Sequence, residues 1–335
     1  MRRRLDRLRH SPRGARRTAG SALALAAALL LAGCAGDPDP IELVVEPASF
    51  DVAVGDDQRL LVGLFTPERQ LVAHGEVELG LAYLGDDGEA QAPIEQTAPA
   101  RFVSVPGTTP GDTTEQPSLV EDTGTGVYAA TVDLDRPGLW GVRIVGELED
   151  GTPISGNRVL QVLEEHLVPA PGDEAPQVDN HTLADVEAGD VEAIAVDSRA
   201  QGPNDEVAHP QLHRTTVAEA IGAGRPVVVA IATPVYCATR FCGPLTDVVA
   251  ELATTYDDRA EFVHIEVWED FDEQRLNDAA AAFIQTESGG NEPWVFLIDA
   301  DGRIADRWDN ILDLDELTDA LEALPSLPDA GGADG

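Results

Sequence analysis

Lysine is absent from the 335-residue sequence, and all 22 positively charged side chains are arginine. This absence excludes Schiff-base, pyridoxal-phosphate and Walker-A lysine chemistry. The single methionine is Met1, so methionine cannot act as a buried metal ligand. Positive charge is also scarce, because 61 acidic side chains give a net charge of −39. A nucleic-acid backbone requires a positive surface, so we expect no nucleic-acid partner.

What the chain does contain is enough apolar material to build cores. Hydrophobic residues make up 43% of the sequence, which argues against an acidic disordered tail. The length of the chain suggests about two globular domains.

The first 33 residues have the layout of a secretory signal. Eight of the arginines fall within residues 1–17, an apolar run follows over residues 22–32, and Gly33 precedes Cys34. A charged segment, a short apolar segment and small residues at a cut site are typical of a signal peptide. The apolar run is too short to cross about 30 Å of hydrocarbon as a helix.

The string Leu31-Ala32-Gly33-Cys34 resembles the lipobox of bacterial lipoproteins. In that family the cut falls before the cysteine, which then carries the lipid. The resemblance implies that Cys34 is the lipidation site and that the protein is extracytoplasmic. A lipid would then anchor it to the cell membrane, on the periplasmic or the outer face. The alternative is a soluble secreted protein in which Cys34 lies beside the cut by chance.

The next segment, residues 41–165, shows short apolar runs at period two, broken by Gly, Pro and Asp. This alternation predicts an all-β sandwich, with residues 98–121 as a long surface loop. Residues 126–140, in which a Pro-Gly turn precedes Trp140, resemble immunoglobulin-like sandwich domains of bacterial surface proteins.

A Pro-rich seam separates this segment from a different pattern. Residues 191–196, 226–233 and 261–267 predict strands, and residues 294–298 and 303–308 predict a hairpin. Between them, helices are predicted in four segments, at residues 216–222, 244–256 and 273–286 and after Asp313. The predicted order is β-α-β-α-β-α-β-β-α.

With two cysteines just past the second predicted strand and Pro293 before the hairpin, this order resembles a thioredoxin fold over residues 190–325. The resemblance implies an α/β domain, a mixed sheet flanked by helices, that exchanges disulfides through Cys237 and Cys242. It also implies a cis-proline at Pro293 that packs against the disulfide and offers backbone to a substrate. The alternative is a trans-proline that opens an edge strand.

The cysteine motif departs from the family pattern. Four residues separate Cys237 from Cys242, where thioredoxins have two, so either cysteine could be the nucleophile. We expect a loop that delivers the pair to a helix N-terminus, with Gly243 and Pro244 as the N-cap and first helical residue. Unpaired N–H groups there would stabilise a thiolate. We expect Cys237 to be the more exposed cysteine, because it leads the loop.

Two other functions remain open at this point. One is a non-catalytic binding protein with a structural disulfide, and the other is a copper chaperone. The copper-delivery branch of the superfamily pairs two cysteines with a distant histidine, for which the candidates are His264, in a strand, and His209 and His213, in a loop. Our main interpretation includes no metal and no cofactor.

The sequence thus predicts a thioredoxin-like α/β domain preceded by an immunoglobulin-like sandwich, acting as a thiol-disulfide oxidoreductase on exported proteins. The six predicted segments are a signal peptide (1–33), a lipidated tether (34–40), a sandwich (41–165), a Pro/Asp-rich linker (166–189), a thioredoxin-like domain (190–325) and a disordered tail (326–335).

Overall fold

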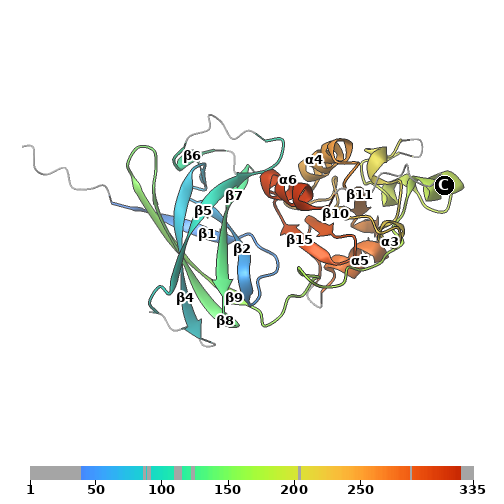
Figure 1. Ribbon diagram of the computed structural model, residues 1–335. Coiled ribbons are helices and arrows are strands. Elements are labelled where there is room, and N and C mark those ends of the chain that lie inside the picture. Colours follow the sequence, from blue (N-terminus) through green and yellow to red (C-terminus); the bar gives the residue numbers. More distant parts are fainter. Residues whose placement is uncertain are drawn as a thin grey trace, which may run out of the picture. The chain divides into compact units, whose positions relative to one another are not determined.

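A computed structural model describes residues 39–325, apart from the short gaps 86–87, 89–91, 109–114, 122–124, 203–204 and 287–288. The signal peptide, Cys34 and the tail after residue 325 lie outside the described residues. The described residues from Pro40 to Pro325 belong to one compact unit. Within it we distinguish a barrel region, residues 41–163, from a C-terminal region, residues 166–325 (Figure 1). Among the described residues, no helix has both the length and the apolar character needed to cross a membrane.

The barrel region is a single nine-stranded sheet with the order β1-β9-β8-β4-β5-β7-β2-β3-β6. Its strands are β1 (Ile41–Pro47), β2 (Gly55–Phe65), β3 (Leu71–Ala73), β4 (Glu76–Gly85), β5 (Gln96–Ser104), β6 (Ser118–Val120), β7 (Gly126–Leu134), β8 (Gly138–Glu147) and β9 (Pro153–Val162). Strand β1 pairs with β9 in parallel and with β2 in antiparallel orientation. These two pairings close seven of the strands into a barrel.

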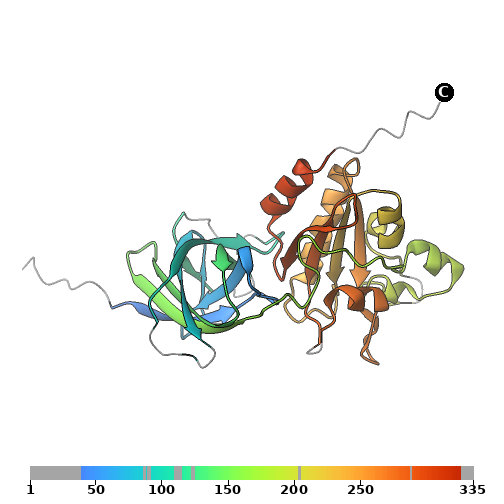
Figure 2. The ribbon, with the colours of Figure 1, turned by 60° about the horizontal axis from the view of Figure 1, so that its bottom comes forward.

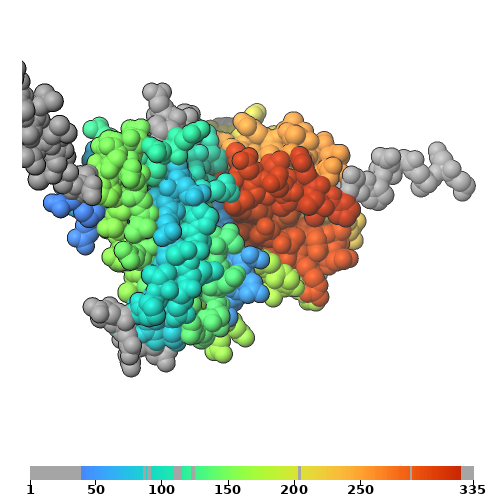
Figure 3. All heavy atoms as spheres, turned by 60° about the vertical axis from the view of Figure 1, so that its left-hand side comes forward, coloured from blue at the N-terminus to red at the C-terminus, as the bar shows by residue number. Residues whose placement is uncertain are grey.

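Alternating residues of the barrel strands fill one apolar interior. Leu79 and Leu81 of β4, Trp140 and Ile144 of β8 and Tyr128 of β7 all belong to this core. Every second residue near the start of β4 and of β5 is exposed instead. Figure 3 shows part of this outer surface in cyan and teal. The period-two pattern therefore predicted the strands but not how the sheet closes.

The C-terminal region contains a four-stranded sheet with the order β11-β10-β14-β15. Its elements are α2 (Leu183–Ala188), 3-10 turns at Ala193–Ala195 and Pro210–Leu212, α3 (Val217–Gly222), β10 (Val227–Ala232), α4 (Cys242–Thr255), β11 (Glu261–Glu266), β12 (Trp268–Asp270), β13 (Arg275–Leu276), α5 (Asp278–Ile284), β14 (Trp294–Ile298), β15 (Ile304–Asp309) and α6 (Leu314–Ala323). One apolar cluster joins the sheet to α3 and α5, and another joins it to α4 and α6. Figure 2 shows the ribbon of this sheet with helices around it.

The predicted fold class is wrong. The chain is mostly β, with a closed seven-stranded barrel and few helices, and it is not a thioredoxin α/β fold preceded by an immunoglobulin-like sandwich. In the barrel region, alternation shows only that one face of each strand is buried, which a sandwich and a barrel share. Segment 98–121, predicted as a surface loop, contains most of β5 and all of β6.

Two local predictions in the C-terminal region are also wrong. Residues 191–196 form no strand, because their apolar side chains belong to a segment that contains the 3-10 turn Ala193–Ala195. The helix predicted over residues 273–286 is reduced to the seven residues of α5, and β13 precedes it. Because residues 191–196 form no strand, the first strand of the predicted α/β order is missing.

Candidate functional site

Cys237 and Cys242 form a disulfide at the N-terminus of α4, with their Cα atoms 6.0 Å apart. The buried strand β10 ends at Ala232 and leads into the loop that carries Cys237. The prediction that Gly243 is the N-cap is wrong, because the helix begins at Cys242 and Phe241 is its N-cap. Pro244 fits the first turn, where backbone N–H groups have no partner within the helix.

The two sulfur atoms have different surroundings. Cys242 is fully buried, whereas Cys237 is half-buried, which agrees with the expected order of exposure. The backbone N–H of Cys242 donates to Sγ of Cys237 over 3.4 Å, and the Thr239 hydroxyl lies 3.3 Å from the same sulfur. Both donors favour a negative charge on Cys237, because hydrogen bonds to a charged form stabilise it.

Pro293 is buried, and the Glu292–Pro293 peptide bond is cis, as the resemblance implied. Strand β14, which begins directly after Pro293, pairs antiparallel with β10 so that Trp294 lies opposite Ile231. The start of β14 and the end of β10 therefore meet at one edge of the sheet, where the cysteine loop also begins. Burial raises the pKa of the neighbouring Glu292 above its usual value.

A buried carboxyl that the sequence interpretation missed, Glu266, lies at the same edge. Glu266 ends β11 and is opposite Ala232, the last residue of β10. Its carboxylate accepts hydrogen bonds from the backbone N–H groups of Ser198, Val267 and Trp268. Burial raises the pKa of Glu266 to about 7, and the hydrogen bonds from these donors limit the rise.

Next to this edge, three further buried side chains converge that the sequence interpretation did not group. Asp197 follows a 3-10 turn, His213 ends the turn Pro210–Leu212, and His264 lies within β11. Oδ2 of Asp197 lies 3.9 Å from Nε2 of His213 and 3.7 Å from Nδ1 of His264. The two imidazole rings meet edge to face, with centroids 5.2 Å apart.

The protonation of this cluster follows from its burial. Burial lowers the pKa of His213 to about 3 and also lowers the pKa of His264, so both imidazoles are neutral at pH 7. Burial alone would raise the pKa of Asp197, but hydrogen bonds from Arg199 and its positive charge lower it overall. The Arg199 guanidinium donates two hydrogen bonds to this carboxylate, of 2.9 and 2.6 Å. Asp197 is therefore an anion beside two neutral imidazoles.

Two hydrogen bonds connect the segment after Asp197 to the loop before the disulfide. The Val235 N–H donates to the Ser198 hydroxyl over 3.1 Å, and the Gln201 amide donates to the Tyr236 hydroxyl over 3.1 Å. The Tyr236 ring stacks on Phe271 at a centroid distance of 3.9 Å. The cysteine loop is thus supported by the same segment that carries Asp197.

The remaining predicted candidates lie elsewhere. Arg240, between the cysteines, is exposed. His209, one of three histidines considered for copper, is not part of the buried cluster but pairs with Asp247 at 2.7 Å. The signal that could have revealed the cluster is the run of residues 262–266 in which His264 and Glu266 interrupt an otherwise apolar strand.

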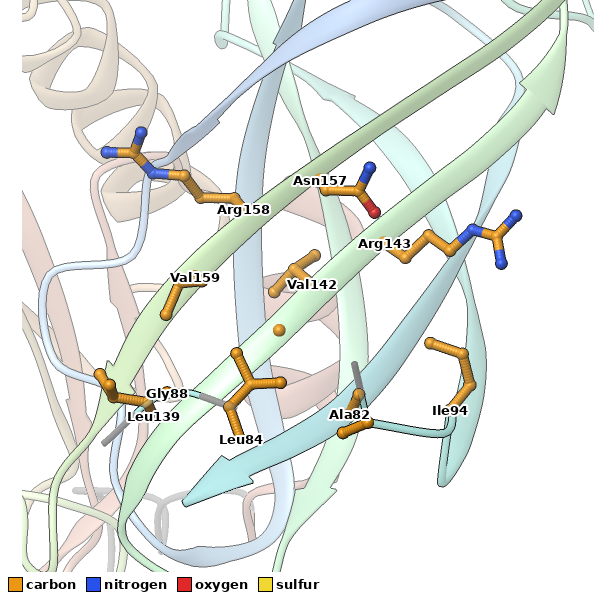
Figure 4. Close-up of a pocket in the computed structure, with 12 residues that line it drawn as sticks. Ala82, Leu84, Gly88, Ile94, Leu139, Val142, Arg143, Asn157, Arg158 and Val159 are labelled. Carbon is orange, nitrogen blue, oxygen red and sulfur yellow. The ribbon is translucent and has the colours of Figure 1, made fainter. Parts of the chain in front are cut away.

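A cavity of about 870 Å³ lies against β4, β8 and β9 of the barrel. Its apolar lining includes Leu84, Ile94 and Leu139, and two arginines, Arg143 and Arg158, also line it (Figure 4). The described lining offers no nucleophile and no acid-base pair.

The sequence matches no protein-family model and no curated protein.

Proposed function

We propose that this protein exchanges disulfides with exported proteins through Cys237 and Cys242, while a lipid on Cys34 holds it at the extracytoplasmic face of a membrane. The observation that carries the proposal is the hydrogen bond from the helical N–H of Cys242 to the sulfur of Cys237. A donor aimed at one sulfur of a half-exposed pair favours that sulfur as the thiolate in exchange.

In the oxidised protein, a client thiolate attacks Sγ of Cys237, the more accessible sulfur. The S–S bond breaks, its electron pair leaves with the sulfur of Cys242, and that sulfur takes up a proton. A mixed disulfide now joins Cys237 to the client. A second client thiolate attacks the client sulfur and releases Cys237 as a thiolate. The client is then oxidised and the protein is reduced by two electrons, and the reverse sequence reduces a client disulfide.

The donors around Cys237 predict its titration. In the reduced full-length protein, Cys237 should react with iodoacetamide with a pKa below the usual thiol value of about 8.5. Thr239→Ala should raise that pKa, because it removes the hydroxyl beside the sulfur. Thr254→Ala, a change later in α4, is the matched control and should leave the pKa unchanged. A usual thiol pKa together with a reduction potential below about −300 mV would indicate an inert structural disulfide instead.

Trapping tests the assignment of the two cysteines. Cys242→Ser should accumulate mixed disulfides with exported proteins in the reducing direction, because the Cys237 thiolate can still attack a client disulfide and the protein has lost the thiol that would resolve the intermediate. Cys237→Ser should trap far less, because Cys242 is fully buried. Equal trapping by the two variants, or none by either, would contradict the mechanism.

The anchor is tested independently. A fatty-acid analogue fed to cells should label the protein, and Cys34→Ser should abolish the label. Equal release of the original protein and the variant into the soluble fraction would contradict anchoring and would leave the thiol chemistry untouched.

A further inference from the structure

We propose that Asp197, His213 and His264 form a binding site for a divalent transition-metal ion of the zinc class. One carboxylate oxygen and two imidazole nitrogens form a donor set that suits such ions. The three ligand atoms lie within 4.8 Å of one another, and the three side chains are buried. The site lies outside the disulfide and does not depend on the proposed exchange activity.

The strongest support is the lack of hydrogen-bond partners. Three buried imidazole nitrogens have no hydrogen-bond partner among the described residues. They are both nitrogens of His213 and Nδ1 of His264. A buried polar atom without a partner is costly, because it has lost its hydrogen bonds to water and gained none in the protein. One ion would satisfy His213 Nε2 and His264 Nδ1 together, and a water molecule that bridges both rings is the competing explanation.

The orientation of each ligand is already determined by a second contact. Nε2 of His264 lies 3.1 Å from the Ala232 carbonyl oxygen, which can only accept, so this nitrogen carries the proton and Nδ1 presents its lone pair. Oδ1 of Asp197 accepts from the backbone N–H and the Nε of Arg199. Oδ2 accepts only from the guanidinium and faces both histidines. Such outer contacts are typical of metal ligands.

The distances are close to those of a metal site. Bonds of about 2.0 to 2.1 Å in a tetrahedron separate the ligand atoms by about 3.3 Å. The observed separations from Asp197 Oδ2 are 3.9 Å to His213 and 3.7 Å to His264. Shifts of about half an ångström would bring the Asp197 oxygen to tetrahedral distance from each imidazole nitrogen, and all three ligand atoms already lie within 4.8 Å of one another.

The charges also permit a cation. Asp197 supplies a carboxylate, and Asp247 balances the nearby Arg199 at 2.8 Å. The ion would connect the segment that contains the 3-10 turns, residues 193–213, to β11 of the sheet. Its role is therefore structural, because it would hold in place the loop that supports Val235 and Tyr236 before the disulfide.

The test measures metal retention by the oxidised full-length protein. The protein is unfolded in urea and refolded with ZnCl₂ or with CoCl₂, since the buried site admits an ion only when it opens, and is then dialysed. We expect one zinc per chain by elemental analysis, and cobalt should give the visible absorption of a four-coordinate site. No retained zinc and no such cobalt band would overturn the proposal and favour the bridging water.

Variants identify the ligands. His213→Ala and His264→Ala should each weaken zinc binding by about 100-fold or more. His181→Ala is the matched control, since this half-exposed histidine pairs with Glu269 and should leave binding unchanged. If the alanine variants do not fold, Asp197→Asn is tested instead, because it keeps the size of the side chain. It should weaken zinc binding to the same extent. Unchanged retention in the folded ligand variants would overturn the assignment.

A last variant separates this site from the cysteines. The double variant Cys237→Ser/Cys242→Ser should retain one zinc, because the sulfur atoms are not ligands. Loss of zinc in that variant, with the histidine variants unaffected, would overturn the proposal and indicate binding by thiolates.

Discussion

The barrel region and the C-terminal region bury different kinds of side chain. Among the described residues, the barrel encloses an apolar core and buries four whole polar residues, Thr66, His74, Ser118 and Thr125. The Asp51 carboxylate is also buried, but it pairs with Arg307 of the C-terminal region. The C-terminal region buries the four acids Asp197, Glu266, Asp309 and Asp313. Buried charge is costly unless it is paired, so it persists where neighbouring groups hold it or where function uses it. The difference supports the proposal that the exchange chemistry lies in the C-terminal region.

Side chains of each region also pack against the other region. Phe50, from the barrel region, packs in the core around β10 and β14 of the C-terminal region. Ile311 of the C-terminal region packs with Leu61 and Val127 of the barrel, and Phe241, beside Cys242, joins the same cluster. Two apolar clusters therefore contain residues of both regions. The predictions below test how far the regions differ and how far they depend on each other.

The largest expected effect comes from Asp51, whose side chain is 2% exposed and pairs with Arg307 of β15 at 2.9 Å. Asp51→Asn should lower the free energy of unfolding by about 3 to 5 kcal/mol, because it leaves a buried guanidinium without its anion. Urea unfolding at pH 7 measures this. A loss below about 1 kcal/mol would show that the pair does not hold the regions together.

The same pair predicts a pH dependence. Burial raises the pKa of Asp51, but hydrogen bonds from the His166 ring and from the Leu167 N–H, together with the charge of Arg307, outweigh this effect and lower the pKa below 3.8. For a carboxyl with a lowered pKa, the stabilisation is present above the unfolded value and is lost as the pH falls through the folded value. The stability difference between the original protein and Asp51→Asn should therefore shrink below about pH 4. A constant difference down to pH 2 would contradict this.

A substitution in the barrel core should lower the free energy of unfolding without changing the reactivity of the Cys237 thiol. Leu79→Ala, at a fully buried position of β4, should cost about 3 kcal/mol because it removes packed methyl groups and leaves a cavity. The iodoacetamide reactivity of Cys237 should not change under conditions where the variant is folded. Leu167→Ala, at a position 54% exposed, is the control and should have almost no effect. A change of thiol pKa in Leu79→Ala would show that the barrel is part of the reactive site.

A smaller effect is expected at the start of α3. The Thr216 hydroxyl accepts from the N–H of Glu219 over 3.1 Å, and the Glu219 carboxylate accepts from the N–H of Thr216, so the two residues form a capping box. Thr216→Ala should lower the free energy of unfolding by about 1 kcal/mol. Thr216→Ser, which keeps the hydroxyl, should recover most of it in the same urea experiment.

The smallest effect is expected at the surface between the regions. Arg101 of the barrel, 50% exposed, lies 2.7 Å from Asp313 and 2.8 Å from Glu316 at the start of α6. Arg101→Ala should cost no more than about 1 kcal/mol, because solvent and salt screen exposed pairs. The cost should fall further in 1 M NaCl. A larger, salt-independent loss would mean that this contact is as important as Asp51.

Much of the local structure was predictable because it depends on neighbouring residues. Period-two runs located β2, β4, β7 and β8, the uninterrupted apolar run located β10, and the Asp299–Gly302 turn located the β14–β15 hairpin. The helix after the cysteines was also expected, with its start misplaced by about one half-turn. In these segments, the residues that set the pattern are close together in the sequence.

The parts that were missed depend on residues far apart in the chain. Barrel closure requires Leu43 of β1 to lie beside Gly156 of β9 while Val45 lies beside Leu64 of β2, and no local pattern encodes either register. The buried cluster likewise draws Asp197, His213 and His264 from two irregular segments and a strand. The pairing of Cys237 with Cys242 could be predicted from the sequence because the two cysteines are only five positions apart.

The position of β1 has a mechanical consequence if the chain is anchored at Cys34. Any tension on the tether would enter the folded protein at Ile41, the first residue of β1. Because β1 is hydrogen-bonded to β9 on one side and to β2 on the other, a pull along the strand must overcome both ladders instead of peeling away a free edge. The closure of the barrel thus puts the attachment point on a strand that resists extraction.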